Sequence, residues 1–372
     1  MANTHMLCPN GCPLGFRLRL RKNGDTMAVA DDDMNRLKEM LGPCPNLGLL
    51  WNRYFPAHNA PKDEALGSST WGVDFSQEYE EANAIPHPDK RRKAVNRIKE
   101  NIDRWKGHGA LLFFCELAQW ALGQPEYTSF VERERGVWAK AVQAEGHRMF
   151  KVKSLMRCRP GIGLPCSFEN GGISLHPLLG FPILAGRSLK GLLAHYLCEE
   201  VFPARKEEND DLQPRAQKLA KHLCPVHDGD DAPEKALARL ANRIFGAGPE
   251  ETESGPSEGA VVFHGGYPAQ NLPSQWFDVD VITVHQKPYY DDKSNRQPPS
   301  DGENPVPVHF LTLAQGIEFA IGLGLSARGR DMESATQDML LDFVQDALAA
   351  ALWDWGFGAR AAAGNGLMVR IG

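Results

Sequence analysis

Residues 171–202 read GGISLHPLLGFPILAGRSLKGLLAHYLCEEVF, and this stretch decides how the rest of the chain is interpreted. Gly186 ends an apolar run, and Ser188 is expected to cap the helix that follows. Apolar residues then recur at helical spacing, at Leu189, Leu192, Leu193, Tyr196 and Leu197. Arg187 and Lys190 would lie beside the free N–H groups and the positive dipole end of this helix. The sequence therefore predicts an anion-binding turn here. The ordinary alternative is a strand-to-helix turn whose charges face water.

A second glycine-rich stretch, GFGARAAAGNG, lies near the end of the chain at 356–366. It follows a helical pattern and precedes a strand pattern, whereas a dinucleotide fingerprint opens a helix after a strand. It also lacks the G-K-[ST] of a P-loop. Glycines this dense allow the backbone to approach a phosphodiester closely, and Arg360 can supply positive charge. A helix C-cap with a β-bulge would explain Gly356 but not the small residues after it.

The bulk composition indicates a globular protein. The chain has 372 residues, 42% of them hydrophobic and 24% charged, which permits one elaborated domain or two ordinary ones. No apolar run reaches the roughly 18–20 residues that a membrane span needs, and the first residues lack the apolar core of a signal peptide. We therefore expect a cytoplasmic protein that does not associate with a membrane.

The net charge of -6 conceals a segregation of charge along the chain. Residues 90–106 and 133–160 each hold eight Lys or Arg against two acidic residues, whereas 199–258 holds 14 Asp or Glu against eight Lys or Arg. The pattern at 148–157 predicts a strand with one apolar face. Lys151, Lys153 and Arg157 would form its other, basic face. Such a face can bind phosphate groups whatever the total charge, although charged runs usually only face solvent.

The order of the periodic segments predicts an α+β fold. A hairpin is expected at Asn23-Gly24, helices at 91–105, 109–122, 188–202, 232–245 and from 334 to 355, and further strands at 260–264, 277–284, 317–325 and 367–371. Ser334 and Gln337 would form a capping box. Residues 146–372 would thus follow the βαββαβ plan of a ferredoxin-like (RRM-like) domain, with long insertions at about 203–258 and 286–307. Residues 1–145 would form a largely helical N-terminal extension.

Metal and cofactor sites are not expected. The eight cysteines include two close pairings with zinc-like spacing, Cys8 with Cys12 and Cys224 with His227. These pairings lie far apart in the sequence, and neither has the spacing of a zinc ribbon or knuckle. Reduced, scattered thiols are the expected state.

Several motifs in this order resemble those of the RAMP superfamily of CRISPR-associated RNA-binding proteins. That superfamily carries a G-S-S-L-K-G motif before its first helix, matched here by the lysine motif (185–191). It also carries a C-terminal G-x-G-x-K/R…G-x-G loop, matched by the glycine loop (356–366). The chain is most similar to the sixth RAMP subunit of type III-B Cmr effector complexes, with further matches at 46–51, 161–163, 169–171, 176–177, 277–285 and 304–312. Arg187 and Ala361 depart from the usual small residue and the usual Thr or Ser. Residues 1–45 match nothing in the family.

The resemblance implies a non-catalytic subunit that binds guide RNA near its 3′ end and caps the filament of backbone subunits. Guide RNA, target RNA and other Cmr subunits are the implied partners, no cofactor is implied, and 286–307 would form a thumb-like hairpin between guide and target. Phosphate and sugar contacts carry no sequence information, which suits a protein that accepts any spacer. The implied RNA-binding residues are Gly186, Arg187, Ser188, Lys190, Gly191, Gly356, Gly358, Arg360, Gly364, Gly366, Lys151, Lys153, Arg157 and His176.

Other functions remain open from the sequence. A metal-independent RAMP endoribonuclease that processes guide RNA precursors needs a general base and an acid, for which His176, His195 and Lys190 are candidates. Both histidines also fit ordinary structural roles. A metal-dependent nuclease would need clustered carboxylates, and Asp278 and Asp280 form one tidy pair. A pure protein scaffold would leave the two basic glycine motifs unexplained.

Overall fold

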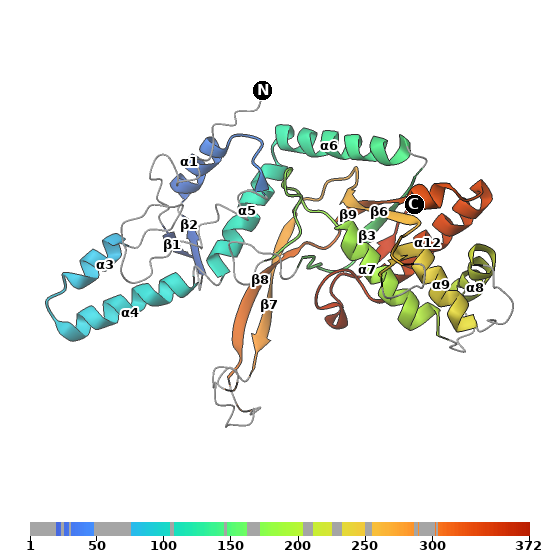
Figure 1. The fold of residues 1–372 in the computed structure, drawn as a ribbon. Coiled ribbons are helices and arrows are strands. Elements are labelled where there is room, and N and C mark those ends of the chain that lie inside the picture. The colour runs from blue at the N-terminus through green and yellow to red at the C-terminus, as the bar shows by residue number, and fades with distance from the viewer. Residues whose placement is uncertain are drawn as a thin grey trace. The chain divides into compact units, whose positions relative to one another are not determined.

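Figure 1 shows the fold of the chain as a computed structural model. The chain forms two units, each assembled from three separate stretches. Unit 1 contains Met1–Ser129, Ile162–Phe181 and Ser274–Thr312, and unit 2 contains Phe130–Gly161, Pro182–Pro273 and Leu313–Gly372. The structure describes residues 20–23, 26–29, 31–47, 76–104, 108–144, 147–161, 172–203, 211–224, 233–249, 255–285, 289, 302 and 304–372. The chain is an α+β protein, as predicted. The predicted division at residue 145 stays a prediction.

Four strands of unit 2 form one antiparallel sheet. They are β3 (Arg148–Ser154), β6 (Val261–Pro268), β9 (Glu318–Leu325) and β10 (Met368–Arg370), in the spatial order β10-β3-β9-β6. Every neighbouring pair is antiparallel, and the register places Phe150 opposite Ile321. Because β3 and β9 occupy the two central positions, their alternating apolar residues supply much of the core of unit 2.

Strand β3 shows the predicted alternation of side chains. Phe150, Val152 and Ser154 are buried, whereas Lys151 and Lys153 are exposed. The strand ends at Ser154, three residues before its predicted end at 157. Two hydrogen bonds to Ile317 mark this end of the strand. The N–H of Ser154 donates to the carbonyl of Ile317 at 2.9 Å, and the Ser154 hydroxyl accepts from the Ile317 N–H at 3.0 Å.

Helices connect the strands of unit 2. Between β3 and β6 the chain forms α7 (Gly186–Tyr196), a π-helical extension (Leu197–Val201), α8 (Leu212–Leu223), α9 (Pro233–Phe245) and the short strands β4 (Gly246–Ala247) and β5 (Ser257–Glu258). Between β9 and β10 it forms α11 (Ala327–Arg330), α12 (Ser334–Asp354) and a 3-10 turn (Ala361–Ala363). Helices α7 and α12 both pack on the sheet. The helix predicted at 232–245 and the helix predicted from 334 are therefore confirmed.

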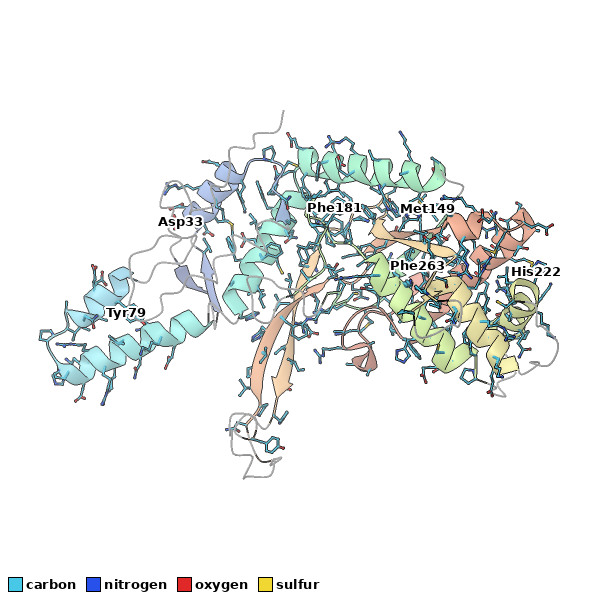
Figure 2. All side chains as sticks on the ribbon, viewed as in Figure 1. Asp33, Tyr79, Met149, Phe181, His222 and Phe263 are labelled. Carbon is cyan, nitrogen blue, oxygen red and sulfur yellow. The ribbon has the colours of Figure 1, made fainter. Side chains whose placement is uncertain are left out.

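Helix α8 was not predicted. Its buried residues Leu212, Ala216, Leu219 and Ala220 follow helical spacing, a signal hidden by the charged composition of 203–258. Figure 2 marks His222 in its last turn, where the ring Nε2 lies 2.8 Å from the hydroxyl of Thr336. This hydrogen bond ties α8 to α12. The predicted insertion at about 203–258 therefore contains a packed helix.

Two predicted helix caps are wrong. Helix α7 begins at Gly186 with Ala185 as its N-cap, so Ser188 lies inside the first turn. Helix α12 has Glu333 as its N-cap, and the Gln337 amide donates to the carbonyls of Arg330 at 2.9 Å and Met332 at 2.7 Å. Gln337 thus satisfies carbonyls of the preceding turn and does not form a capping box.

Unit 1 combines helices with two small sheets. It contains β1 (Leu20–Asn23), β2 (Thr26–Val29), α1 (Asp31–Leu41), α3 (Ser76–Asn83), α4 (Pro88–Arg104), α5 (Ala110–Leu122), β7 (Phe277–Val284) and β8 (Val306–Leu313). Two elements cross the boundary between the units. The last residue of β8 lies in unit 2, and α6 (Pro125–Ala144) begins in unit 1 and ends in unit 2. Strands β1 and β2 form the predicted hairpin, with Asn23 paired to Thr26. The predicted thumb at 286–307 lies mostly outside the described residues. Within the described ranges, no helix is long and apolar enough to cross a membrane.

The core of unit 1 lies where α5 packs on β7. The Phe114 and Phe277 rings lie 5.1 Å apart, and Trp276 and Tyr127 are fully buried. The predicted strand at 277–284 coincides with β7, and the apolar helix predicted at 109–122 is α5. This helix is core, as its composition indicated.

Candidate nucleic-acid interface

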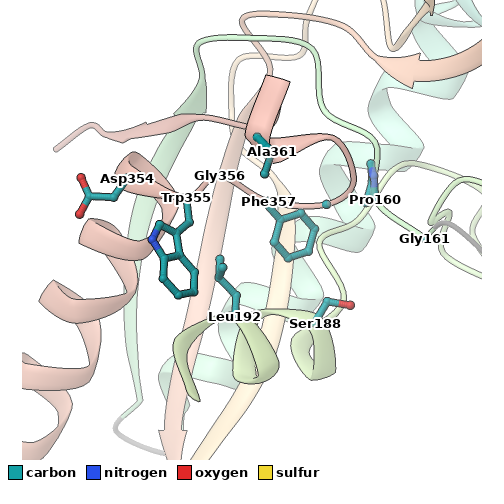
Figure 3. Close-up of a pocket in the computed structure, with 11 residues that line it drawn as sticks. Pro160, Gly161, Ser188, Leu192, Asp354, Trp355, Gly356, Phe357 and Ala361 are labelled. Carbon is teal, nitrogen blue, oxygen red and sulfur yellow. The ribbon is translucent and has the colours of Figure 1, made fainter. Parts of the chain in front are cut away.

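The lysine motif and the glycine loop, although far apart in sequence, line one cavity of unit 2 (Figure 3). The cavity has a volume of about 440 Å³ and opens widely to solvent. Its lining comprises Ser188 and Leu192 of α7, Pro160 and Gly161 after β3, Asp354 and Trp355 at the end of α12, and Gly356, Phe357, Gly358, Ala361 and Ala362 of the glycine loop. The structure thus brings together the two motifs that the sequence singled out.

Aromatic side chains form part of this cavity, and they were not predicted from the sequence. Figure 3 shows the rings of Trp355 and Phe357 near Leu192 of α7. The indole of Trp355 meets Tyr196 edge to face at 5.4 Å, and the Tyr196 hydroxyl donates to Asp354 Oδ2 at 2.6 Å. The sequence signal that could have predicted these aromatic side chains is that Trp355 and Phe357 lie directly before and after Gly356. The wall therefore offers both apolar rings and a carboxylate.

The glycine loop folds back on the segment that follows β3. Its backbone bonds run from Gly366 N–H to the Arg157 carbonyl at 2.7 Å, and from Ala359 N–H to the Arg159 carbonyl at 3.0 Å. Phe357 N–H also donates to the Gly366 carbonyl at 2.8 Å. Arg157 is thus placed beside the glycine loop by its own backbone.

The glycines of this loop are required by its own packing. Gly356, Gly358, Gly364 and Gly366 all have positive φ. A Cβ at Gly366 would lie 2.2 Å from the Phe357 carbonyl oxygen, and one at Gly358 would lie 2.5 Å from the Arg159 carbonyl oxygen. The packing of the loop itself therefore accounts for these glycines, and their close approach to a phosphodiester stays a prediction.

Arg360 provides a separate indication of function. Its backbone is left-handed, with φ 61° and ψ 29°, and no other non-glycine residue among those described has positive φ. A left-handed conformation costs an L-residue about 1–2 kcal/mol. Strain of this kind at a cationic residue, beside an open cavity, is typical of a binding site.

Lys190 has a structural partner in this conformation. Its ammonium group donates to the carbonyl of Phe245, the last residue of α9, at 2.7 Å. Cations at the C-terminal end of a helix satisfy its last carbonyls and complement its dipole. The predicted phosphate contact of Lys190 stays a prediction.

We expect Lys190→Met to lower the free energy of unfolding by about 1–2 kcal/mol, because this substitution removes a charge-assisted hydrogen bond to a helix end. Urea unfolding followed by circular dichroism would measure it. Lys218→Met is the matched control, since Lys218 is exposed on α8 and its replacement should change stability by less than about 0.5 kcal/mol. Equal effects of the two substitutions would contradict the assigned role of Lys190.

The remaining predicted cations lie on or next to the sheet and helix α7. Arg187 and Ser188 are exposed in the first turn of α7, and Lys151 is exposed on β3. Lys153 Nζ lies 3.7 Å from Glu318 Oε1, so its charge is partly compensated. Gly186 packs against β6, since a Cβ there would lie 2.1 Å from the Phe263 carbonyl oxygen. Gly191 has open space around it, so packing does not explain its glycine.

His176 belongs to unit 1, not to the unit that contains the cavity. Its Nδ1 accepts hydrogen bonds from the N–H groups of Leu178 at 3.3 Å and Leu179 at 3.0 Å, which closes a turn. Asn46, from another matched motif, donates to the Leu178 carbonyl at 2.8 Å. Two separated family motifs therefore meet in unit 1, and His176 has a turn-forming role there.

The groups considered for catalysis also have structural roles. His195 is exposed on α7, with its ring edge to face against Trp355 at 5.1 Å. Asp278 and Asp280 lie on β7, and each accepts a hydrogen bond from the N–H of the next residue. Burial, with a smaller contribution from Asp278, raises the pKa of the Cys115 thiol to about 12, so this cysteine is not a reactive thiolate.

Comparison with known proteins identifies the relationship. No protein-family model matches the sequence. A curated relative, the CRISPR system Cmr subunit Cmr6 of Pyrococcus furiosus, is 28% identical over 238 residues. The chain is similar to this Cmr subunit. The matched region covers 59% of this chain and 66% of the relative, just under two thirds of its length.

One solved structure has the same fold over nearly the whole chain. A chain in the type III-B Cmr-beta complex bound to cognate target RNA matches with a TM-score of 0.50 and 17% identity, over 92% of this chain and 98% of that chain. At this identity the likeness shows the fold alone. The crystal structure of Cmr6 from Pyrococcus furiosus matches at a TM-score of 0.35 and 22% identity, over 61% of this chain and 98% of that chain, which is too low to support an argument.

Proposed function

We propose that this chain is a non-catalytic RNA-binding subunit of a type III-B CRISPR effector complex. It would bind the guide RNA backbone near its 3′ end and cap the filament of backbone subunits. One observation above all supports the proposal: Ser188 of the lysine motif and the glycine loop line the same open cavity. The similarity to a Cmr subunit supports the other Cmr subunits as partners, and the likeness to a chain of a complex bound to target RNA agrees with that setting.

The proposal includes a ferredoxin-like core. Numbered along the chain, the four strands of the unit 2 sheet lie in the order 4-1-3-2, all antiparallel. The crossover from the first to the second contains α7, and the crossover from the third to the fourth contains α12. This connectivity supports a βαββαβ core with helices inserted before β6 and the β7–β8 excursion inserted before β9.

In this proposal the phosphates of single-stranded RNA lie against Arg360, Arg157, Lys151 and Lys153. These cations come from the glycine loop and from β3 and its continuation, which backbone hydrogen bonds hold together. The rings of Trp355 and Phe357 could take a stacked or edge-on base, an interaction that tolerates any sequence. Binding would therefore depend on salt and hardly on sequence.

The test is a titration of a labelled, sequence-scrambled RNA of about 40 nucleotides at two salt concentrations, with the protein alone and with its neighbouring subunits. We expect Arg360→Ala and Lys151→Ala/Lys153→Ala each to weaken binding roughly tenfold. The slope of the logarithm of affinity against the logarithm of salt concentration should become shallower by about 0.7 for each phosphate that the variant no longer neutralises. Lys218→Ala, a charge removed from α8, should leave the affinity unchanged.

Two results would overturn the proposal. If the wild type binds no RNA, alone or in the assembled complex, the chain is a protein scaffold. If RNA is cleaved in the presence of a chelator, and His176→Ala or His195→Ala abolishes cleavage, the chain is the metal-independent endoribonuclease. Cleavage and binding can be observed on the same gel.

A further inference from the structure

Three arginines of unit 2 surround the end of α8, in a place that the cavity and the glycine loop do not include. Arg239 and Arg243 lie one turn apart on α9, so they share a face of that helix. Arg328 lies on α11. All three act electrostatically on the thiol of Cys224, the C-cap residue of α8. We call these three residues the arginine triad.

The backbone around the arginine triad is fixed by hydrogen bonds. Ala260 N–H donates to the Arg243 carbonyl at 2.7 Å, and Ser326 N–H donates to the Ala260 carbonyl at 3.0 Å. Arg328 Nη1 donates to the Glu258 carbonyl at 2.9 Å. These bonds join the end of α9, the turn after β5 and the start of α11, so the segments that carry Arg243 and Arg328 are held together.

Several N–H groups of the triad lack an acceptor. Nε of Arg239, Nη2 of Arg239 and Nε of Arg243 are buried from solvent and make no hydrogen bond. Within the described part of the chain, none of the three arginines forms a salt bridge. An unsatisfied buried donor costs about 1–3 kcal/mol, so each one calls for an explanation.

The charges in this cluster also oppose one another. Burial, followed by the charge of Arg328, lowers the pKa of the Arg243 guanidinium. The charge of Asp331 raises the pKa of Arg243, but its contribution is the smallest of those that shift this pKa. Burial raises the pKa of the Cys224 thiol despite the three positive charges, so the thiol does not serve as their counter-ion.

We propose that the arginine triad binds a phosphate group. A tetrahedral phosphate presents several strong acceptors in different directions, which suits converging guanidinium groups, whereas one carboxylate pairs with a single guanidinium side by side. Arg215 pairs with Asp211 and Asp346. Outside the triad, the other described charges of α8, α9 and their flanks (211–224 and 233–249) are Lys218, Lys221 and Lys235 against Glu234. This surplus favours a phosphate over a single acidic side chain of a partner. The phosphate could be the free ion or part of an RNA.

The experiment measures Tm of the full chain in inorganic phosphate, acetate and chloride at equal ionic strength. Phosphate at about ten times its Kd should raise Tm of the wild type by about 2–4 °C, and acetate should match chloride. Arg239→Gln/Arg243→Gln should lose this rise. It should also unfold at a higher temperature than the wild type in chloride, because buried unpaired donors and repelling charges are removed. Lys218→Gln/Lys235→Gln removes the same amount of charge, one lysine from α8 and one from α9, and should keep the rise.

Each result decides the question. Equal stabilisation by acetate and phosphate, or loss of the rise in both double variants, would overturn the proposal in favour of a carboxylate of a protein partner or a non-specific charge effect. If a short RNA displaces inorganic phosphate from the wild type but not from Arg239→Gln/Arg243→Gln, the phosphate belongs to RNA. If RNA does not displace it, the ligand is the free ion. The proposal does not depend on RNA binding at the glycine loop, since inorganic phosphate is the probe.

Discussion

Gly366→Ala is expected to lower the free energy of unfolding by about 2–5 kcal/mol, from left-handed backbone strain together with a steric overlap. Gly366 has φ 79°, and a Cβ would lie 2.2 Å from the Phe357 carbonyl oxygen, which is backbone and cannot turn away. The same two residues close the glycine loop, because the Phe357 N–H donates a hydrogen bond to the Gly366 carbonyl. The substitution should therefore open the loop as well as destabilise unit 2.

Gly364→Ala separates the two causes. Gly364 has φ 84°, close to that of Gly366, but a Cβ there would meet nothing within 4 Å. Its replacement should cost only the backbone strain, about 1–2 kcal/mol. Urea unfolding of both variants measures the difference. If the two alanines cost the same, the close approach of Gly366 to Phe357 is not what holds the loop.

Gly186→Ala is expected to destabilise the protein by about 1–3 kcal/mol or more, as in an overpacked core, although alanine favours a helix. A Cβ at Gly186 would lie 2.1 Å from the Phe263 carbonyl oxygen and 3.0 Å from the Gly265 nitrogen. Helix α7 would then have to move away from β6, where Leu184 and Gly266 exchange two backbone hydrogen bonds at 2.8 and 2.9 Å. Unfolding by urea or heat tests this.

Gly191 in the same helix should behave in the opposite way. It is exposed in the interior of α7, and a Cβ would meet nothing within 4 Å. Gly191→Ala should stabilise the protein by about 0.5–1 kcal/mol. If this more stable variant also binds RNA less well, the glycine serves close approach of a ligand. If Gly191→Ala destabilises the protein, the packing of α7 differs from that described.

The sequence predicted the elements whose pattern is local and strong. Strand β7 and helices α5 and α9 appear within a residue or two of their expected ranges, because each carries a continuous apolar period. The family resemblance assigned both the lysine motif and the glycine loop to RNA binding, and the structure places Ser188 of the first motif beside the second. Helix α8 was not predicted because its apolar residues are interspersed with charged ones, and its stability comes from tertiary packing.

Side-chain partners were the part that the sequence could not predict. Lys190 reaches the end of α9, and this hydrogen bond depends on how α7 and α9 pack, which no local pattern encodes. The predicted cap at Ser188 failed because the close approach of Gly186 to β6 starts the helix two residues earlier. The positive φ of Arg360 was likewise invisible, since arginine gives no signal for a left-handed turn. Packing between distant elements decided each case.

The position of β3 between β9 and β10 has a consequence for how the protein is made. As the ribosome extends the chain, β3 is complete at Ser154, but its first strand partner arrives only with Glu318–Leu325 and its second with the final Met368–Arg370. The backbone N–H and C=O groups on both edges of β3 therefore have no strand partner while more than a third of the chain is synthesised. Pairings of such high sequence separation slow folding and leave strand edges open to wrong pairing. Nascent chains that stall before β9 should therefore be bound by chaperones, and chains lacking only β10 should aggregate.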